Sequence, residues 1–177
     1  MWYLQVTPNL PLVLCGDSTG TIKWWANGSH GTHSDCKGHS GGCMTLGSSM
    51  AISSLIKQKL NTRSSIKTEL VTTNDFMPIL LWTNNFFRVQ DFQISKMVLH
   101  QDNQSAILFQ KNGKLSSLKC TKHINMCYFF ITDHIMKGNL SIKYCLMESM
   151  AADFFTKLLQ GSMFLEFCCA ILNHPTW

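Results

Sequence analysis

The sequence predicts an α/β fold in which helices cover both faces of a mixed five-stranded sheet. Segments with strand-like alternation and segments with helical spacing follow one another in the order β-β-β-α-β-α-α-β-α. Three consecutive strands with short connections predict an antiparallel meander, whereas the two later strands, separated by helices, need crossovers. The 177 residues, 45% of them apolar, are enough for one domain with a packed core.

The first three strands are predicted from short segments bounded by turn-forming residues. Residues 21–26 (TIKWWA) predict the first strand, and we expect the turn formers Asn27, Gly28 and Ser29 to end it. Residues 42–46 and 51–54 predict two more strands, which the sequence GSS at 47–49 joins as a hairpin.

A long helix is predicted next, capped by Ser64 or Ser65 and kinked at Pro78. Apolar residues at helical spacing place one of its faces on the core: Ile66, Leu70, Met77 and Leu81. Residues 97–101 predict the fourth strand, and a short helix follows it to Lys111.

The remaining elements are a helix over 124–135, closed by Lys137 and Gly138, a fifth strand over 140–145 and a last helix over 148–157. We therefore divide the chain into a lead-in at 1–19 that continues an upstream region, a domain at 20–160 and a C-terminal tail at 161–177.

Composition limits the classes of partner and compartment. The net charge of +5 is compatible with a polyanionic partner, but the lysines and arginines are scattered and form no basic cluster. Residues 1–14 lack the basic start of a signal peptide, and no apolar run of about 18 residues could span a membrane. We expect an intracellular protein, in the cytoplasm or the nucleus, whose cysteines are reduced.

A string of metal-ligating residue types lies between the first two predicted strands. Its members are separated by two or three residues: His30, His33, Cys36, His39 and Cys43. Structural zinc sites use such spacings, but as two ligand pairs separated by a longer loop. We favour a polar loop between two strands, with a zinc-dependent interaction module as the alternative.

One carboxylate has a position typical of a functional site. Asp102 directly follows the apolar fourth strand, and a short amphipathic helix begins after it. The carboxyl ends of strands in open α/β sheets form the crevice in which ligands and metals bind.

Six segments, in order and covering nearly the whole chain, give a specific resemblance. They are GTIKWW at 20–25, HSGGCMTLG at 39–47, KQKLNTRSS at 57–65, QDNQSAI at 101–107, TKHIN at 121–125 and ADFFTK at 152–157. Together they resemble the RNase H domain at the C-terminal end of copia-type retrotransposon polyproteins. The fold of that family has the element order predicted above.

The resemblance implies hydrolysis of the RNA strand of RNA–DNA hybrids during reverse transcription, with two Mg²⁺ (or Mn²⁺) ions held by acidic side chains. It implies Glu69, Asp102 and Asp153 as catalytic metal ligands. The implied partners are the hybrid and an upstream reverse transcriptase domain, with no membrane and no small-molecule substrate. The nucleic-acid-binding positions that it implies are Ser29, Asn103, Gln104, Lys122 and His123.

The first ligand position departs from the family. Where family members have an Asp after the tryptophans of the first strand, this chain has Asn27. A neutral amide cannot bridge two cations with anionic oxygens, so we expect impaired hydrolysis. The alternative is a catalytically dead retroelement remnant that binds nucleic acid weakly. For Glu69, an exposed acid in the first turns of its helix remains a second interpretation.

Overall fold

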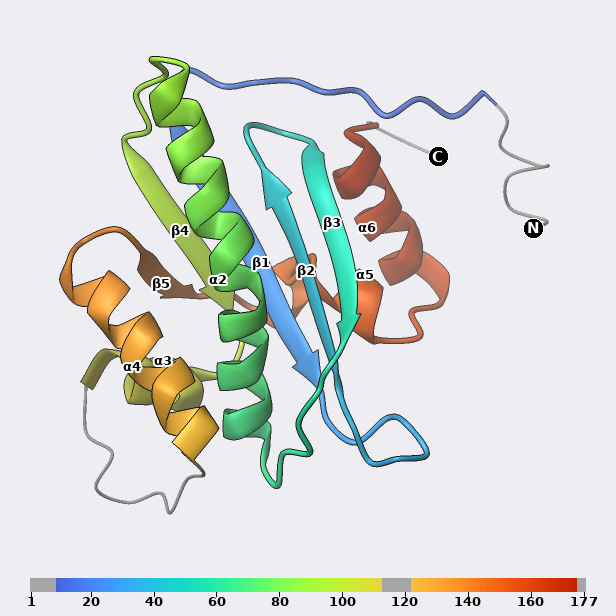
Figure 1. Cartoon of the computed structure of the whole chain (residues 1–177). Helices are drawn as coiled ribbons and strands as arrows, with labels where there is room; N and C mark the ends of the chain where they lie inside the picture. The colour runs from blue at the N-terminus through green and yellow to red at the C-terminus, as the bar shows by residue number, and fades with distance from the viewer. Residues whose placement is uncertain (1–8, 113–121, 175–177) are drawn as a thin grey trace.

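A mixed sheet organises the computed structural model, which describes residues 9–112 and 122–174. Its strands are β1 (Thr21–Ser29), β2 (His39–Thr45), β3 (Met50–Lys57), β4 (Lys96–Gln101) and β5 (Ser141–Tyr144). They lie in the order β3-β2-β1-β4-β5 (Figure 1). The β1–β2 and β2–β3 pairs are antiparallel, whereas β1–β4 and β4–β5 are parallel. The predicted meander with two further strands is confirmed.

Helices cover both faces of the sheet, as predicted. One face carries α2 (Ser65–Val89), α3 (Gln104–Asn112) and α4 (Lys122–Met136), and the other carries α5 (Asp153–Thr156) and α6 (Gly161–Leu172) (Figure 1). Alternate residues of β1, Ile22 and Trp24, are fully buried in the larger core with α2 and α4. A smaller cluster around Cys43 and Phe167 fills the opposite side. Side chains of β1 therefore alternate between two different packing environments.

Strand β1 is longer than predicted, and this changes the position of Asn27. The residues expected to end the strand instead continue the ladder, with Asn27 opposite Gly41 and Ser29 opposite His39. Pairing with β2 outweighs the turn propensity of Asn-Gly-Ser, because each ladder residue gains backbone hydrogen bonds. Asn27 therefore lies inside a strand, buried to 4% exposure.

Helix α2 begins where predicted and has 25 residues, with Pro78 inside it. Of the two candidate caps, Ser64 is the one whose side chain accepts a hydrogen bond from the backbone N–H of Lys67. The helix lies close to β2 because Gly42 has no side chain, since a Cβ atom there would lie 2.6 Å from the ring of Phe76.

The predicted last helix over 148–157 is wrong as a single element. A 3-10 turn, η1 (Met147–Ser149), and the four-residue helix α5 replace it. Between them, Met150 and Ala152 are completely buried. Burying these side chains turns the chain back onto the sheet, so the helix that begins at Asp153 is separate from η1.

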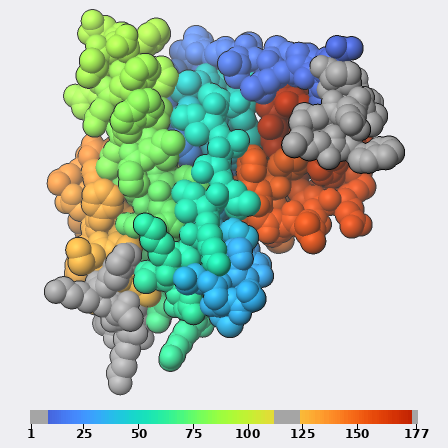
Figure 2. All heavy atoms as spheres, turned by 45° about the vertical axis from the view of Figure 1, so that its right-hand side comes forward, coloured from blue at the N-terminus to red at the C-terminus, as the bar shows by residue number. Residues whose placement is uncertain are grey.

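The two terminal segments pack against the sheet and each other. The part predicted as a tail contains α6, and residues 9–19 of the lead-in run along the β2–β3 hairpin toward it (Figure 2). Val13 donates its backbone N–H to the carbonyl of Leu172 at 3.0 Å, and Ser48 donates to the carbonyl of Cys15 at 3.1 Å. Within 9–112 and 122–174, no helix is long and apolar enough to cross a membrane.

Candidate active site

Two positions of the site lie at the carboxyl ends of neighbouring parallel strands. Strands β1 and β4 pair with Trp25 opposite His100. Continued by two residues, this register places Asn27 beside Asp102, on the face of the sheet toward α5. Asp102 directly follows β4 and is half-buried. The prediction that Asp102 directly follows the fourth strand is confirmed.

Glu69 reaches the same edge from α2. It is buried to 4% exposure, so the interpretation as an exposed acid is wrong. Its Oε1 accepts a hydrogen bond from the N–H of Gly28 at 3.1 Å, and its Oε2 accepts one from Gln101 Nε2 at 3.2 Å. Burial, with a contribution from the charge of Asp102, raises the pKa of Glu69 to about 8, against the effect of these two donors.

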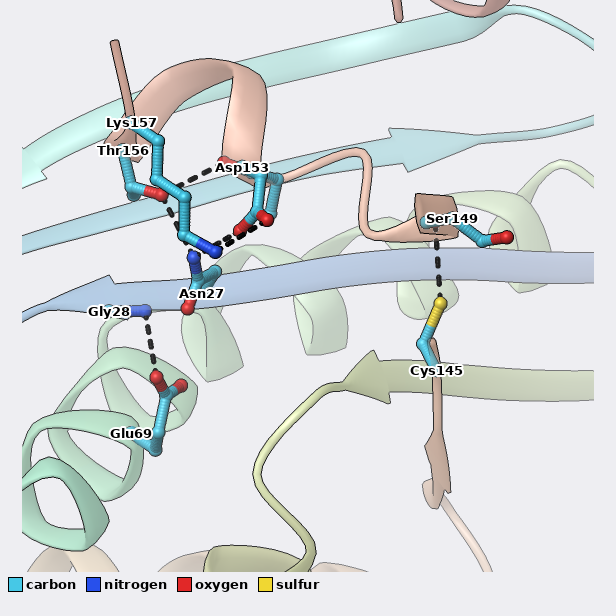
Figure 3. A network of polar contacts seen from close by, with 9 residues as sticks. Asn27, Gly28, Glu69, Cys145, Ser149, Asp153, Thr156 and Lys157 are labelled. Carbon is cyan, nitrogen blue, oxygen red and sulfur yellow. Dashed lines mark hydrogen bonds and ion pairs between the residues drawn. The ribbon is translucent and has the colours of Figure 1, made fainter. Parts of the chain in front are cut away.

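Asp153 approaches from the opposite side, on α5, and is 3% exposed. Its Oδ1 accepts a short hydrogen bond from Asn27 Nδ2, and Lys157 Nζ lies 2.6 Å from its Oδ2. Asn27 Nδ2 also donates to Thr156 Oγ1 at 2.9 Å. Figure 3 shows the amide nitrogen of Asn27 turned toward α5 and its oxygen toward the side of β1 where Glu69 lies. A carboxylate only accepts, so the amide nitrogen must face Asp153.

The three carboxylates influence one another electrostatically. Burial raises the pKa of Asp153 and the charge of Asp102 adds to the increase, while Lys157 and Asn27 oppose it. Because Asp102 also acts on Glu69, the edge where β1 and β4 end gathers three acidic groups. Such an arrangement attracts cations.

The donor set does not fit the two-ion centre that the resemblance implies. Both carboxylate oxygens of Glu69 and both of Asp153 already accept hydrogen bonds from nitrogen donors. Asn27 presents an N–H donor where a bridging carboxylate would be needed. In the described parts of the chain, no three His, Cys, Asp or Glu side chains form a group that could hold a metal ion.

Three of the implied nucleic-acid positions lie at or just after the ends of β1 and β4. Ser29 ends β1, and its Oγ accepts from the backbone N–H of His39 at 3.2 Å. Asn103 caps α3, because its Oδ1 accepts from the N–H of Ala106 at 3.0 Å, and Gln104 is exposed at the start of that helix. Lys122 and His123 begin α4, but their side chains lie outside the described part of the structure.

The His/Cys string is divided between different environments. His33 and His39 form a pair through their Nε2 atoms at 2.7 Å, while His30 contacts Thr68. The expectation of a loop is wrong for His39, which lies in β2, whereas Cys43 lies in that strand as predicted. Cys43 is buried in the smaller cluster, so the string does not gather around one point.

Sequence reasoning assigned no role to three polar residues that contact the site. Gln101 is fully buried beside Glu69, and Thr156 and Lys157 contact Asn27 and Asp153. For Lys157 a signal existed, since an Asp four residues before a Lys on a helix predicts an ion pair. For Gln101 and Thr156 only the tertiary contacts identify a role.

Solved RNase H structures superpose on this chain. LC11-RNase H1, isolated from compost by a metagenomic approach, is 14% identical with a TM-score of 0.53, and the match covers 76% of this chain and 91% of that one. An N-terminal RNase H domain from Mycobacterium tuberculosis is 10% identical with a TM-score of 0.54, covering 77% and 90%. The chain has the fold of RNase H.

LC11-RNase H1 has also been solved in complex with an RNA/DNA hybrid, and that structure matches with 11% identity, a TM-score of 0.53 and coverage of 76% and 92%. No family model and no curated protein matches this chain. At 10–14% identity, these solved structures show that the chain shares their fold.

Proposed function

We propose that this chain is the RNase H domain of a copia-type retrotransposon polyprotein, that it binds RNA–DNA hybrids, and that its hydrolysis of the RNA strand is impaired. The six sequence segments and the RNase H fold support the domain type. The observation that carries the impairment is the hydrogen bond from the Asn27 amide to Asp153.

In the family that the sequence resembles, two divalent ions activate the attacking water and stabilise the leaving oxygen. Here Glu69 and Asp102 retain carboxylates on one side of the edge. Asn27 directs an N–H donor at Asp153, where a shared anionic ligand is required. Loss of one preorganised electrostatic group lowers a rate by about 10²–10³, and loss of a bridging ligand should lower it at least as much.

Hybrid binding depends less on the carboxylates. LC11-RNase H1 binds an RNA/DNA hybrid in its solved complex. In this chain, Asn103 uses its Oδ1 to cap α3, which leaves its amide N–H₂ for a phosphate at the start of that helix. With Gln104 exposed beside it and Ser29 at the end of β1, these residues form a polar surface next to the site. Contacts of this kind to the phosphates of a duplex position it without reading its base sequence.

The second candidate function is a catalytically dead remnant that binds nucleic acid weakly, and the ion pair between Lys157 and Asp153 favours it. In either case the parent polyprotein would carry a reverse transcriptase domain before the lead-in at 1–19 and would act inside the cell. The domain would span 20–160, with α6 packed on it as an extension.

The test is cleavage of a labelled RNA–DNA hybrid in Mg²⁺ or Mn²⁺ by the unaltered chain and by Asn27→Asp. We expect Asn27→Asp to cleave at least about 100-fold faster, and adding Asp102→Asn to it should abolish the gain. Hybrid binding in EDTA should be equal for all three proteins and should weaken as salt rises.

Three outcomes would contradict parts of this proposal. Equal cleavage by the unaltered chain and Asn27→Asp would show that Asn27 causes no impairment. Absence of cleavage by both proteins, with hybrid binding retained, would favour the catalytically dead remnant. Absence of hybrid binding in every variant would remove the RNase H function itself.

A further inference from the structure

A group of polar contacts around Asp153 includes hydrogen bonds that join α5 to β1. Both oxygens of Asp153 are used, one by the Asn27 amide from β1 and the other by the Lys157 ammonium from the end of α5 (Figure 3). Thr156 adds a third contact by accepting from Asn27. We call Asn27, Asp153, Thr156 and Lys157 the α5 clasp.

Burial makes the positive charge of Lys157 necessary. The Asp153 side chain is 4% exposed, whereas that of Lys157 is 39% exposed. A carboxylate so far removed from water is costly unless a cation or several donors compensate its charge. Lys157 supplies that cation from within the chain, and its partly exposed ammonium keeps its own hydration.

The clasp adds polar contacts to a short element whose Phe154 and Phe155 pack on the smaller cluster. Helix α5 has four residues and no side-chain cap. It lies directly against the sheet, since a Cβ atom on Gly41 would be 2.5 Å from the Thr156 methyl group. In this position, the hydrogen bonds from Asn27 connect α5 to the central strand.

A divalent ion beside Asp153 would have to displace both donors. The ammonium of Lys157 and the N–H₂ of Asn27 carry positive charge toward the carboxylate, so they repel a second cation. Around Glu69 the two donors are the N–H of Gly28 and the amide of Gln101, which are neutral. The two sides of the edge therefore differ in whether a cation is already present.

We propose that Lys157 is the built-in cation of this site: it takes the place of a second divalent ion at Asp153, while the Asn27 amide connects α5 to β1. This inference rests on the proposed function, because the expectation of a second ion comes from the RNase H family. At most one divalent ion then binds, on the side of Glu69 and Asp102.

The experiment uses the full chain and two readouts other than activity. Thermal unfolding in EDTA is measured for Lys157→Met and for Lys137→Met. Lys137 is the matched control, because it pairs with Asp133 at the same i,i+4 spacing and the same 2.6 Å, but with both side chains more than half exposed. We expect Lys157→Met to lower the Tm by about 3–6 °C and Lys137→Met by less than about 2 °C.

Calorimetric Mn²⁺ titration provides the second readout. The unaltered chain should bind at most one ion, and Asn27→Asp combined with Lys157→Met should bind two. Two ions on the unaltered chain, or equal Tm losses for the two methionine variants, would overturn the proposal. If the double variant does not fold in EDTA, restoration of its unfolding transition by Mn²⁺ supports the proposal and failure to restore it contradicts it. Hybrid binding in EDTA is measured independently of the Tm and of the number of bound Mn²⁺ ions. Failure of the proposed function can therefore be distinguished from failure of this inference.

Discussion

The two sides of the candidate site keep buried carboxylates in different ways. On the α2 side, Glu69 is held by neutral donors and faces the charge of Asp102, and its pKa rises to about 8. On the α5 side, Asp153 is equally buried, but Lys157 compensates its charge and the Asn27 amide donates a hydrogen bond to it.

This difference shows how an acidic cluster is stable without bound metal. A buried carboxyl group either takes up a proton or gains a cationic partner, and each side of the site uses one of these solutions. The α2 side exchanges a proton and stays available to a divalent ion. The α5 side is neutralised by the chain itself. The two sides should therefore respond differently to pH and to mutation.

The largest expected effect is the pH dependence caused by Glu69. The folded protein holds this proton up to about pH 8, whereas the unfolded chain loses it near the ordinary value of 4.5. The free energy of unfolding in EDTA should therefore fall, by up to about 5 kcal/mol, as pH rises from 4.5 to 8, and stay level above that range.

Urea unfolding at several pH values measures this contribution as the difference between the unaltered chain and Glu69→Gln. The difference removes the opposite trend expected from His39 and His100, whose pKa values are lowered mainly by burial. Glutamine retains the size of Glu69, and Gln101 can turn its unpaired buried oxygen toward the new amide. Identical pH profiles would mean that Glu69 is ionised in the folded protein.

A smaller effect is expected from Asp153→Asn. The substitution removes the charge that Lys157 and Asn27 contact, and we expect the free energy of unfolding to fall by about 2 kcal/mol at pH 7. Asp133→Asn on α4 is the control, because it breaks an exposed pair of the same spacing and should cost less than about 0.5 kcal/mol. Similar losses in chemical denaturation would show that burial does not distinguish the two pairs.

The smallest effect tests one hydrogen bond of the α5 clasp. Thr156→Val keeps the shape of the side chain but removes the acceptor for Asn27 Nδ2, and we expect a loss of about 1 kcal/mol. Thr83→Val is the control, because the buried Thr83 hydroxyl only donates to the carbonyl of Ile79 in its own helix. A loss no larger than that of the control, measured by denaturation, would remove Thr156 from the clasp.

Sequence patterns predicted the order of the strands and helices better than the residues at which they begin and end. The order of strands and helices followed from alternation and helical spacing, which report on burial along a single element. The predicted end of β1 was wrong because the strand continues through the pairing of Asn27 with Gly41, which depends on another strand. The helix over 148–157 was wrong for a related reason, since the burial of Met150 and Ala152 comes from contacts that local propensity does not contain.

The sequence by itself determined the class of fold, the position of Asp102 after a strand and the presence of an amide, Asn27, after the tryptophans of β1, because each depends on local order along the chain. Only the tertiary structure decided that Glu69 is buried, that the Asn27 amide faces Asp153 and that Lys157 compensates that carboxylate. These facts concern side chains from elements far apart in sequence. The partners of these side chains, and the pKa values of the two buried carboxyl groups, depend on burial away from water. That burial exists only once β1, α2 and α5 are packed together.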